Sequence, residues 1–291
     1  MILKVGRGLR TRRESATTCA AGSESPRNPA IANSLVLVPV LVLAFWPVWR
    51  WCVARMTDRS DEPLGLIALL TAAALLPRRG WRDALPTGSL VAVVSVTAAY
   101  VAAFDRVPLL VRGAFAVLAI ACVLPRDRAR SPLPLVALLL LSLPLIATLQ
   151  FYLGFPVRAV TAWCAAHVLT LAGYATTAHG TILHWAGEEI LVDAPCSGIR
   201  MLWTASYLSA TLAAVHRLPA RRFLRLAQWT AAVVFLANLA RTVLLFFLET
   251  GLWPNPAWAH EAAGLAMFLV AAGACVAAAG WLRPAPACTH P

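Results

Sequence analysis

Hydrophobic residues occur in long runs along the chain, separated by short polar or basic segments. Most runs hold about 15–25 residues with few charges, the length that a helix needs to cross about 30 Å of hydrocarbon. They lie at 34–54, 64–77, 84–104, 107–125, 132–150, 156–178, 199–216, 226–249 and 259–282. The pattern predicts an all-α, polytopic helical membrane protein. The composition agrees, because only 13% of the residues are charged, against about 25% in a soluble domain.

The charges of the loops indicate how many of these runs cross the membrane. Three loops are rich in arginine, at 78–83, 126–130 and 216–225, whereas 179–198 contains only acidic charges. Basic loops stay in the cytoplasm. If every run crossed the membrane, the basic loops 126–130 and 216–225 would lie on opposite faces. If the run 156–178, which is polar on one side, is instead an interfacial or re-entrant helix on the outer face, all basic loops and both termini lie inside. We therefore predict about eight transmembrane helices plus this one.

The excess of positive charge changes the expected partners very little. The net charge is +12, but the cations cluster in short loops, as they do in proteins that face anionic lipid. We therefore expect membrane lipid as a partner and no nucleic acid. The 7 cysteines form no Cys-x-x-Cys pair and no Cys/His cluster, so we expect no metal site, no disulfide framework and no cofactor.

The runs and loops divide the chain into four parts. Residues 1–33 are basic and then rich in Ser, Pro and Gly, which predicts a disordered cytoplasmic tail. Residues 34–150 form an N-terminal membrane bundle of about five spans. Residues 151–282 form a second part, an external segment plus three spans, and 283–291 a short cytoplasmic tail. Within the external segment, the alternation around "EEILVD" predicts a short extended piece.

Three chemically different side chains fall near the outer face, on three consecutive spans. Cys196 precedes a helix that starts near Ile199, whose N-terminal dipole would stabilise a thiolate, and Ser197 or Asp193 can cap that helix. Arg241 lies inside the next span, and His260 lies at the outer start of the last one. A thiol, an imidazole and a guanidinium are a nucleophile, a candidate base and a cation for developing negative charge.

Each of these residues also has a structural interpretation. An ionisable residue inside a span is costly and by default suggests function, and Asn238 lies three residues before Arg241, on the same helical face. Arg241 can instead snorkel or pair with Glu249. His260 can be an ordinary residue of the membrane interface, and Cys196 a small apolar residue.

At these positions the sequence resembles the exosortase/archaeosortase family of membrane transpeptidases. "DAPCSGIRML" is similar to the family's Cys-Ser-Gly-x-Arg block, "ANLARTVLL" to its Asn-x-x-Arg block, and "AHEAAGLAMF" to its His-Asp/Glu-x-x-Gly block. An apolar helix with "LTLAGY" precedes them. The resemblance covers roughly 150–275, and the first half of the chain carries no motif that matches.

The resemblance implies roles for particular residues. The catalytic ones would be Cys196 as nucleophile with Arg241 and His260 as its partners. Supporting or substrate-binding roles fall to Asn238, Ser197, Gly198, Arg200 and Glu261; Glu261 stands where Asp is commoner. The resemblance also implies an integral plasma-membrane enzyme with its site facing outward. Its substrates would be proteins with a C-terminal sorting signal, made of a short motif such as Pro-Glu-Pro, a transmembrane helix and a basic tail.

Two other classes of function stay open. In a transporter or channel, Arg241 and Asn238 would line a substrate path. Against this class, the two halves of the chain show no internal repeat and no paired broken helices, and Arg241 lies near the outer end of its span. In a non-catalytic subunit for assembly or polysaccharide export, Cys196 would be structural only.

Overall fold

The computed structural model describes residues 33–57, 64–125, 131–192 and 197–283. The predicted tails at 1–33 and 283–291 lie outside the described residues except for one residue each, and so does the basic loop 126–130. Cys196 and Asp193 lie outside them as well.

The first half of the described chain is a helical bundle. It contains α1 (Ser34–Ala44), α2 (Trp46–Thr57), α3 (Leu64–Leu75), α4 (Thr87–Ala102) and α5 (Leu109–Val123). The predicted run 34–54 is bent by 65° between α1 and α2. Phe45 sits at this bend, buried edge-to-face against Tyr100 of α4, so the bend encloses part of the bundle core.

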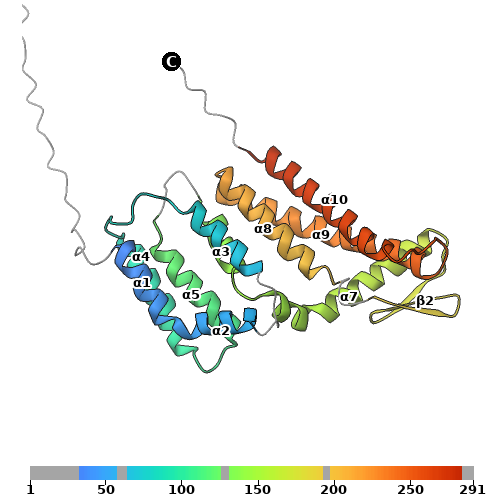
Figure 1. The fold of residues 1–291 in the computed structure, drawn as a ribbon, viewed down its shortest axis with the longest axis horizontal. Helices are drawn as coiled ribbons and strands as arrows, with labels where there is room; N and C mark the ends of the chain where they lie inside the picture. Colours follow the sequence, from blue (N-terminus) through green and yellow to red (C-terminus); the bar gives the residue numbers. More distant parts are fainter. Residues whose placement is uncertain (1–32, 58–63, 126–130, 193–196, 284–291) are drawn as a thin grey trace, which may run out of the picture.

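The second half places three helices side by side (Figure 1). It contains α6 (Leu133–Leu141), α7 (Ile146–Leu171), three short strands, α8 (Ile199–Val215), α9 (Ala220–Glu249) and α10 (Ala259–Trp281). Helices α8, α9 and α10 pack against one another, and α7 runs from the bundle to the three strands, contacting both α8 and α9 on the way. The predicted helix start near Ile199 is confirmed.

The predicted span 132–150 is wrong as a single helix. It ends at Leu141, and α7 begins at Ile146 after a bend of 91°. Pro144 explains the break, because proline has no N–H to donate and its ring clashes with the carbonyl four residues earlier. The Ser142 hydroxyl also donates to the carbonyl of Leu139 (2.6 Å). The helix expected at 156–178 therefore starts ten residues earlier, and its placement at the membrane interface remains a prediction.

Helix lengths and apolarity identify an integral membrane protein. In the described part of the chain, α9 and α10 are each long and apolar enough to cross a membrane, and the number rises to at most four if each of the bent pairs α1–α2 and α6–α7 is one span. Helices α3, α4 and α5 are apolar but shorter. The count of about eight spans stays a prediction.

A small antiparallel sheet lies at the far end of α7. It consists of β1 (Thr177–His179), β2 (Ile182–Trp185) and β3 (Glu188–Leu191), in the order β1-β2-β3. Ala186 and Gly187, with φ of 50° and 86°, form the kind of two-residue turn that matches strand twist. Strands β2 and β3, joined by this turn, are called the hairpin below. Leu183 and Ile190 bury themselves in a core cluster with residues of α7 and α9. The extended piece predicted around "EEILVD" is confirmed as β3.

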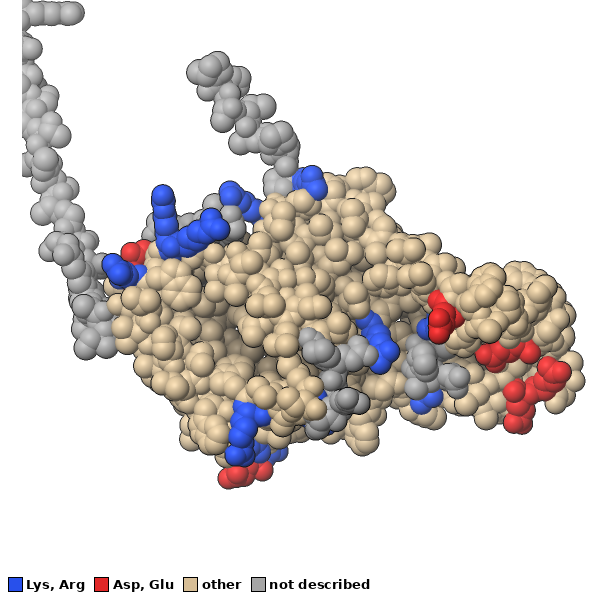
Figure 2. All heavy atoms as spheres, viewed as in Figure 1, with Lys and Arg blue, Asp and Glu red and all other residues tan. Residues whose placement is uncertain are grey.

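At the end of the molecule opposite the sheet, the C-terminal ends of α3, α8 and α10 lie together. Ala72, Ala213 and Ala279 share one buried cluster, and the Arg283 guanidinium donates to Nε2 of His216 (2.6 Å). Partial burial and then the positive charge of Arg283 lower the pKa of His216, which favours the neutral imidazole that accepts this bond. Figure 2 shows arginines along this edge and a group of acidic side chains at the hairpin end.

Candidate active site

The candidate site forms where the start of α8 meets α9, and its first contact is between Gly198 and Asn238. Gly198 has φ of +70°, and a Cβ built there would lie 3.1 Å from Cγ of Asn238. Asn238 is only 2% exposed. Glycine is therefore required twice at this position, once by the left-handed backbone and once by the close approach of the amide.

Ser197 is also buried and connects α8 to α7. Its hydroxyl donates to Oε1 of Gln150 (2.8 Å) and accepts the N–H of Ile199 (3.4 Å). The N-cap position of α8 is taken by Gly198. Ser197, one of the two residues predicted to cap this helix, lies one position earlier and still accepts a first-turn N–H, and the other, Asp193, lies outside the described residues. The contact with Gln150 was not predicted from the sequence, because Gln150 stands in a different apolar run.

Arg241 lies against the start of α10. A Cβ built at Gly264 would lie 3.3 Å from both Cζ and a terminal nitrogen of the Arg241 guanidinium. The guanidinium thus packs on bare backbone, one helical turn beyond His260. The Asn-x-x-Arg segment and the His-Glu-x-x-Gly segment, which are separate in the sequence, meet at this contact.

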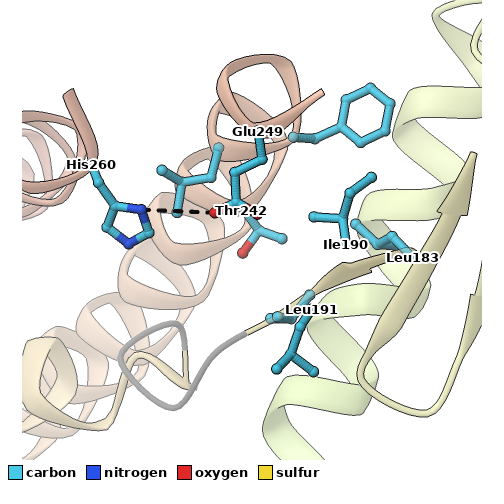
Figure 3. A pocket seen from close by; sticks show the side chains of 9 residues that line it. Leu183, Ile190, Leu191, Thr242, Glu249 and His260 are labelled. Carbon is cyan, nitrogen blue, oxygen red and sulfur yellow. Dashed lines mark ion pairs between the residues drawn. The ribbon is translucent and has the colours of Figure 1, made fainter. Parts of the chain in front are cut away.

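His260 faces the end of α9. Its Nδ1 lies 3.8 Å from Oε1 of Glu249, the last residue of that helix (Figure 3). The two side chains are 40% and 36% exposed, so water reaches both of them and neither is locked in place by packing. A carboxylate beside an imidazole can hold the ring in one orientation and leave the other nitrogen for proton transfer. The sequence alone suggests Glu249 only as a partner for Arg241.

A narrow pocket separates this pair from the hairpin. Its walls are Leu183 and Ile190 on the strand side and Thr242 on α9, with His260 and Glu249 at its polar edge (Figure 3). The accessible volume is about 10 Å³, room for about one water molecule. Apolar side chains of the strands and the His260 imidazole therefore line the same pocket.

Two other predicted site residues, Arg200 and Glu261, lie at the surface. Arg200 is exposed in the first turn of α8, and Glu261 is exposed in the first turn of α10, where a carboxylate interacts well with the helix dipole. Cys196 is outside the described residues. Among the residues that are described, no three His, Cys, Asp or Glu side chains gather as a metal-binding group.

Comparison with known proteins identifies the family. No curated protein and no solved structure matches the chain. The family described as transmembrane exosortase (Exosortase_EpsH) matches residues 26–277. The match includes the first half, where the sequence reading found no motif, as well as the segments that contain Asn238, Arg241 and His260. The chain therefore belongs to the transmembrane exosortase family.

Proposed function

We propose that the protein is a membrane-embedded cysteine transpeptidase that cleaves C-terminal sorting signals of exported proteins. One observation carries this proposal beyond family membership: the motif segments of α8, α9 and α10 interlock through two glycines. Gly198 admits Asn238, and Gly264 admits the Arg241 guanidinium. Glycines that allow polar side chains to approach backbone this closely are expected where a polar site is assembled between helices.

The proposed reaction starts from the Cys196 thiolate. It attacks the scissile carbonyl carbon, and the resulting tetrahedral oxyanion is stabilised by Arg241. The C–N bond then breaks, the leaving amine takes a proton from His260, and the acyl group remains as a thioester on sulfur. An amine, hydroxyl or water acceptor loses its proton to His260, attacks the thioester and regenerates the thiolate. Asn238 would orient Arg241, and Arg200 would bind substrate or help to stabilise the thiolate.

The proposed orientation puts both termini in the cytoplasm and the site on the external face of the plasma membrane. The arginines around 216–225 and Arg283 share one end of the molecule, and Glu188 and Glu189 occupy the hairpin at the other. Positive loops favour the cytoplasmic side, which leaves the hairpin, His260 and Glu249 outside. A substrate with a transmembrane helix would then present its motif at the outer interface.

A transporter is the second candidate, and one observation favours it. Two bent helix pairs, α1–α2 and α6–α7, are present, although the sequence reading expected no paired broken helices. Broken helices line the substrate paths of many transporters. Asn238 and Arg241, however, lie on α9, which continues unbroken from Ala220 to Glu249, so the polar side chains and the breaks are on different helices.

The two functions are separated by one experiment. The chain is expressed with an exported reporter that ends in a motif, a transmembrane helix and a basic tail, and the length of the reporter is read on a gel. We expect shortening that depends on the motif and stops when a membrane-impermeant maleimide is added to a chain retaining only Cys196. The proposed enzymatic function would be contradicted if the reporter stayed at full length at all times, or if it were still shortened after Cys196 had been labelled completely.

The Gly264 contact predicts a loss of activity from a single methyl group. Gly264→Ala should lower kcat/KM for the reporter by about 10-fold, because a Cβ 3.3 Å from the Arg241 guanidinium displaces it by a few tenths of an ångström. The matched control is Gly273→Ala in the same helix, where a Cβ meets no atom within 4 Å. Both substitutions gain about 1 kcal/mol of helix propensity, so equal activities of the two variants would refute the contact's role.

A further inference from the structure

We propose that the outer edge of β3 binds the substrate as an added strand, so that an extended segment of the exported protein lies beside His260. The inference rests on the proposed function and names the conformation in which the substrate is held. The surface consists of the backbone of Glu189 and Leu191, and it is called the open edge below. Its occupant is an extended peptide with neutral or basic side chains.

The backbone of β3 has hydrogen-bonding groups that β2 does not use. β3 is an outer strand of the sheet. The N–H of Val192 donates to the carbonyl of Thr181, next to β2 (2.9 Å). Bonded and non-bonded residues alternate along an antiparallel pair, so the N–H and C=O groups of Glu189 and Leu191 point away from β2. In the described part of the chain, no residue pairs with these four groups.

The open edge lies next to the candidate base. Leu191 and His260 line the same narrow pocket, with Glu249 beside the imidazole (Figure 3). Leu191 is 53% exposed, so its side of the strand is accessible to a ligand. A peptide bound to the backbone of Leu191 therefore has its own backbone next to the imidazole that the proposed reaction needs for proton transfer.

Contacts on both faces of the hairpin hold the open edge in place. On one face, Ile190 and Leu183 are buried in a core cluster with residues of α7 and α9. On the other face, Nδ1 of His184 lies 3.6 Å from Oε1 of Glu189, the residue directly opposite in the register. A strand fixed in this way is pre-organised, so binding a partner costs less conformational entropy.

The chemistry of the open edge selects its occupant. Its N–H and C=O groups need a partner that both donates and accepts, which a lipid acyl chain cannot do. An extended peptide does both. A second copy of β3 would bring its own Glu188 and Glu189 toward those of the first, and like charges on adjacent strands disfavour that pairing. The same two carboxylates favour neutral or basic side chains in the added strand.

The first test reads the conformation of the bound substrate and needs no activity. All native cysteines are replaced by alanine, Leu191→Cys is introduced, and single cysteines are placed at successive positions of the reporter before its transmembrane helix. Disulfide-linked product is measured at each position on a non-reducing gel. Because side chains of a strand alternate between its two faces, we expect strong and weak positions to alternate over about five residues. The control is Leu252→Cys, an exposed leucine between α9 and α10, which should give no alternation.

Three results of this test would overturn the proposal. One is cross-linking that recurs every three to four positions, as expected for a bound helix. Another is uniform or absent cross-linking along the reporter. The third is a disulfide between two copies of the Leu191→Cys chain that the reporter does not displace. A wild-type chain that leaves the reporter intact refutes the transpeptidase alone, and the cross-linking pattern still decides how the reporter binds.

The second test removes one backbone donor from the open edge. Leu191→Pro deletes the N–H that points away from β2, a position at which an outer strand tolerates proline. The matched control, Leu191→Ala, also shortens the side chain but keeps the N–H. We expect KM for the reporter to be about 3- to 10-fold higher for the proline variant than for the alanine variant, the effect of one hydrogen bond, with little change in kcat. Equal KM values in the two variants would contradict binding through this edge.

Discussion

Replacing Cys196 with serine is expected to lower the rate of reporter processing by about 10³-fold or more. The substitution replaces one sulfur atom by oxygen and nearly preserves the size of the side chain. A lower processing rate would therefore reflect the weaker nucleophile and not a change in packing. A serine hydroxyl remains protonated at neutral pH. The Cys196 thiol precedes α8 in the sequence, and we propose that the dipole of this helix and Arg200 stabilise its anion. The measurement is the fraction of reporter shortened over time in membranes that contain equal amounts of each variant.

The control for this change is another cysteine of the same chain. Cys164→Ser on α7 removes a half-buried thiol that belongs to no site contact described above, and we expect wild-type processing from it. A trapped acyl-enzyme gives a second readout: wild type with a slow acceptor should carry a hydroxylamine-sensitive reporter fragment, and Cys196→Ser should not. Processing by Cys196→Ser at the wild-type rate would end the assignment of this residue as the nucleophile.

Arg241→Lys is expected to lower kcat/KM by about 10²- to 10³-fold while leaving the protein folded, a loss of the size seen when one oxyanion donor is removed. Lysine keeps the positive charge but replaces the planar fork by a compact ammonium, which lacks the rigid pair of parallel N–H donors of a guanidinium. The guanidinium lies with Cζ 3.3 Å from the Cβ position of Gly264, a flat contact that suits a plane. The measurement is kcat/KM for the reporter, normalised to the amount of folded enzyme.

The matched control is Arg225→Lys, an exposed arginine near the start of the same helix, which should leave kcat/KM unchanged. Comparing the two variants separates the specific role of the guanidinium from any general effect of lysine on α9. Retention of more than about half of wild-type activity by Arg241→Lys would argue against bidentate recognition of the oxyanion or of a substrate carbonyl.

Local patterns in the sequence predicted much of the helical structure. Apolar runs of membrane length correspond to α9 and α10, and the polar-to-apolar change at Ile199 marks the start of α8. The alternation around "EEILVD" became β3. These predictions succeed because the hydrocarbon solvent and the backbone period act on neighbouring residues, without reference to the rest of the fold.

The same reasoning failed where a single residue changed the path of the chain. Pro144 stands in an otherwise unbroken apolar run, so hydropathy alone joined two helices that lie at 91°. A proline inside a run does not always break it, as Pro156 shows by lying within α7. Which proline ends a helix depends on whether neighbouring elements satisfy the backbone groups it leaves without partners.

The sequence by itself determined that this is a helical membrane protein, and its resemblance to a known family supplied the prediction of which polar residues form the site. Cys196, Arg241 and His260 could be named because their spacing along the chain follows a recognisable order. Only the tertiary structure decided the neighbours of these motif residues. The approach of Gly264 to Arg241, of Glu249 to His260 and of Gln150 to Ser197 depends on how α7, α9 and α10 cross. Crossing geometry is set by packing over whole helices, and no local pattern records it.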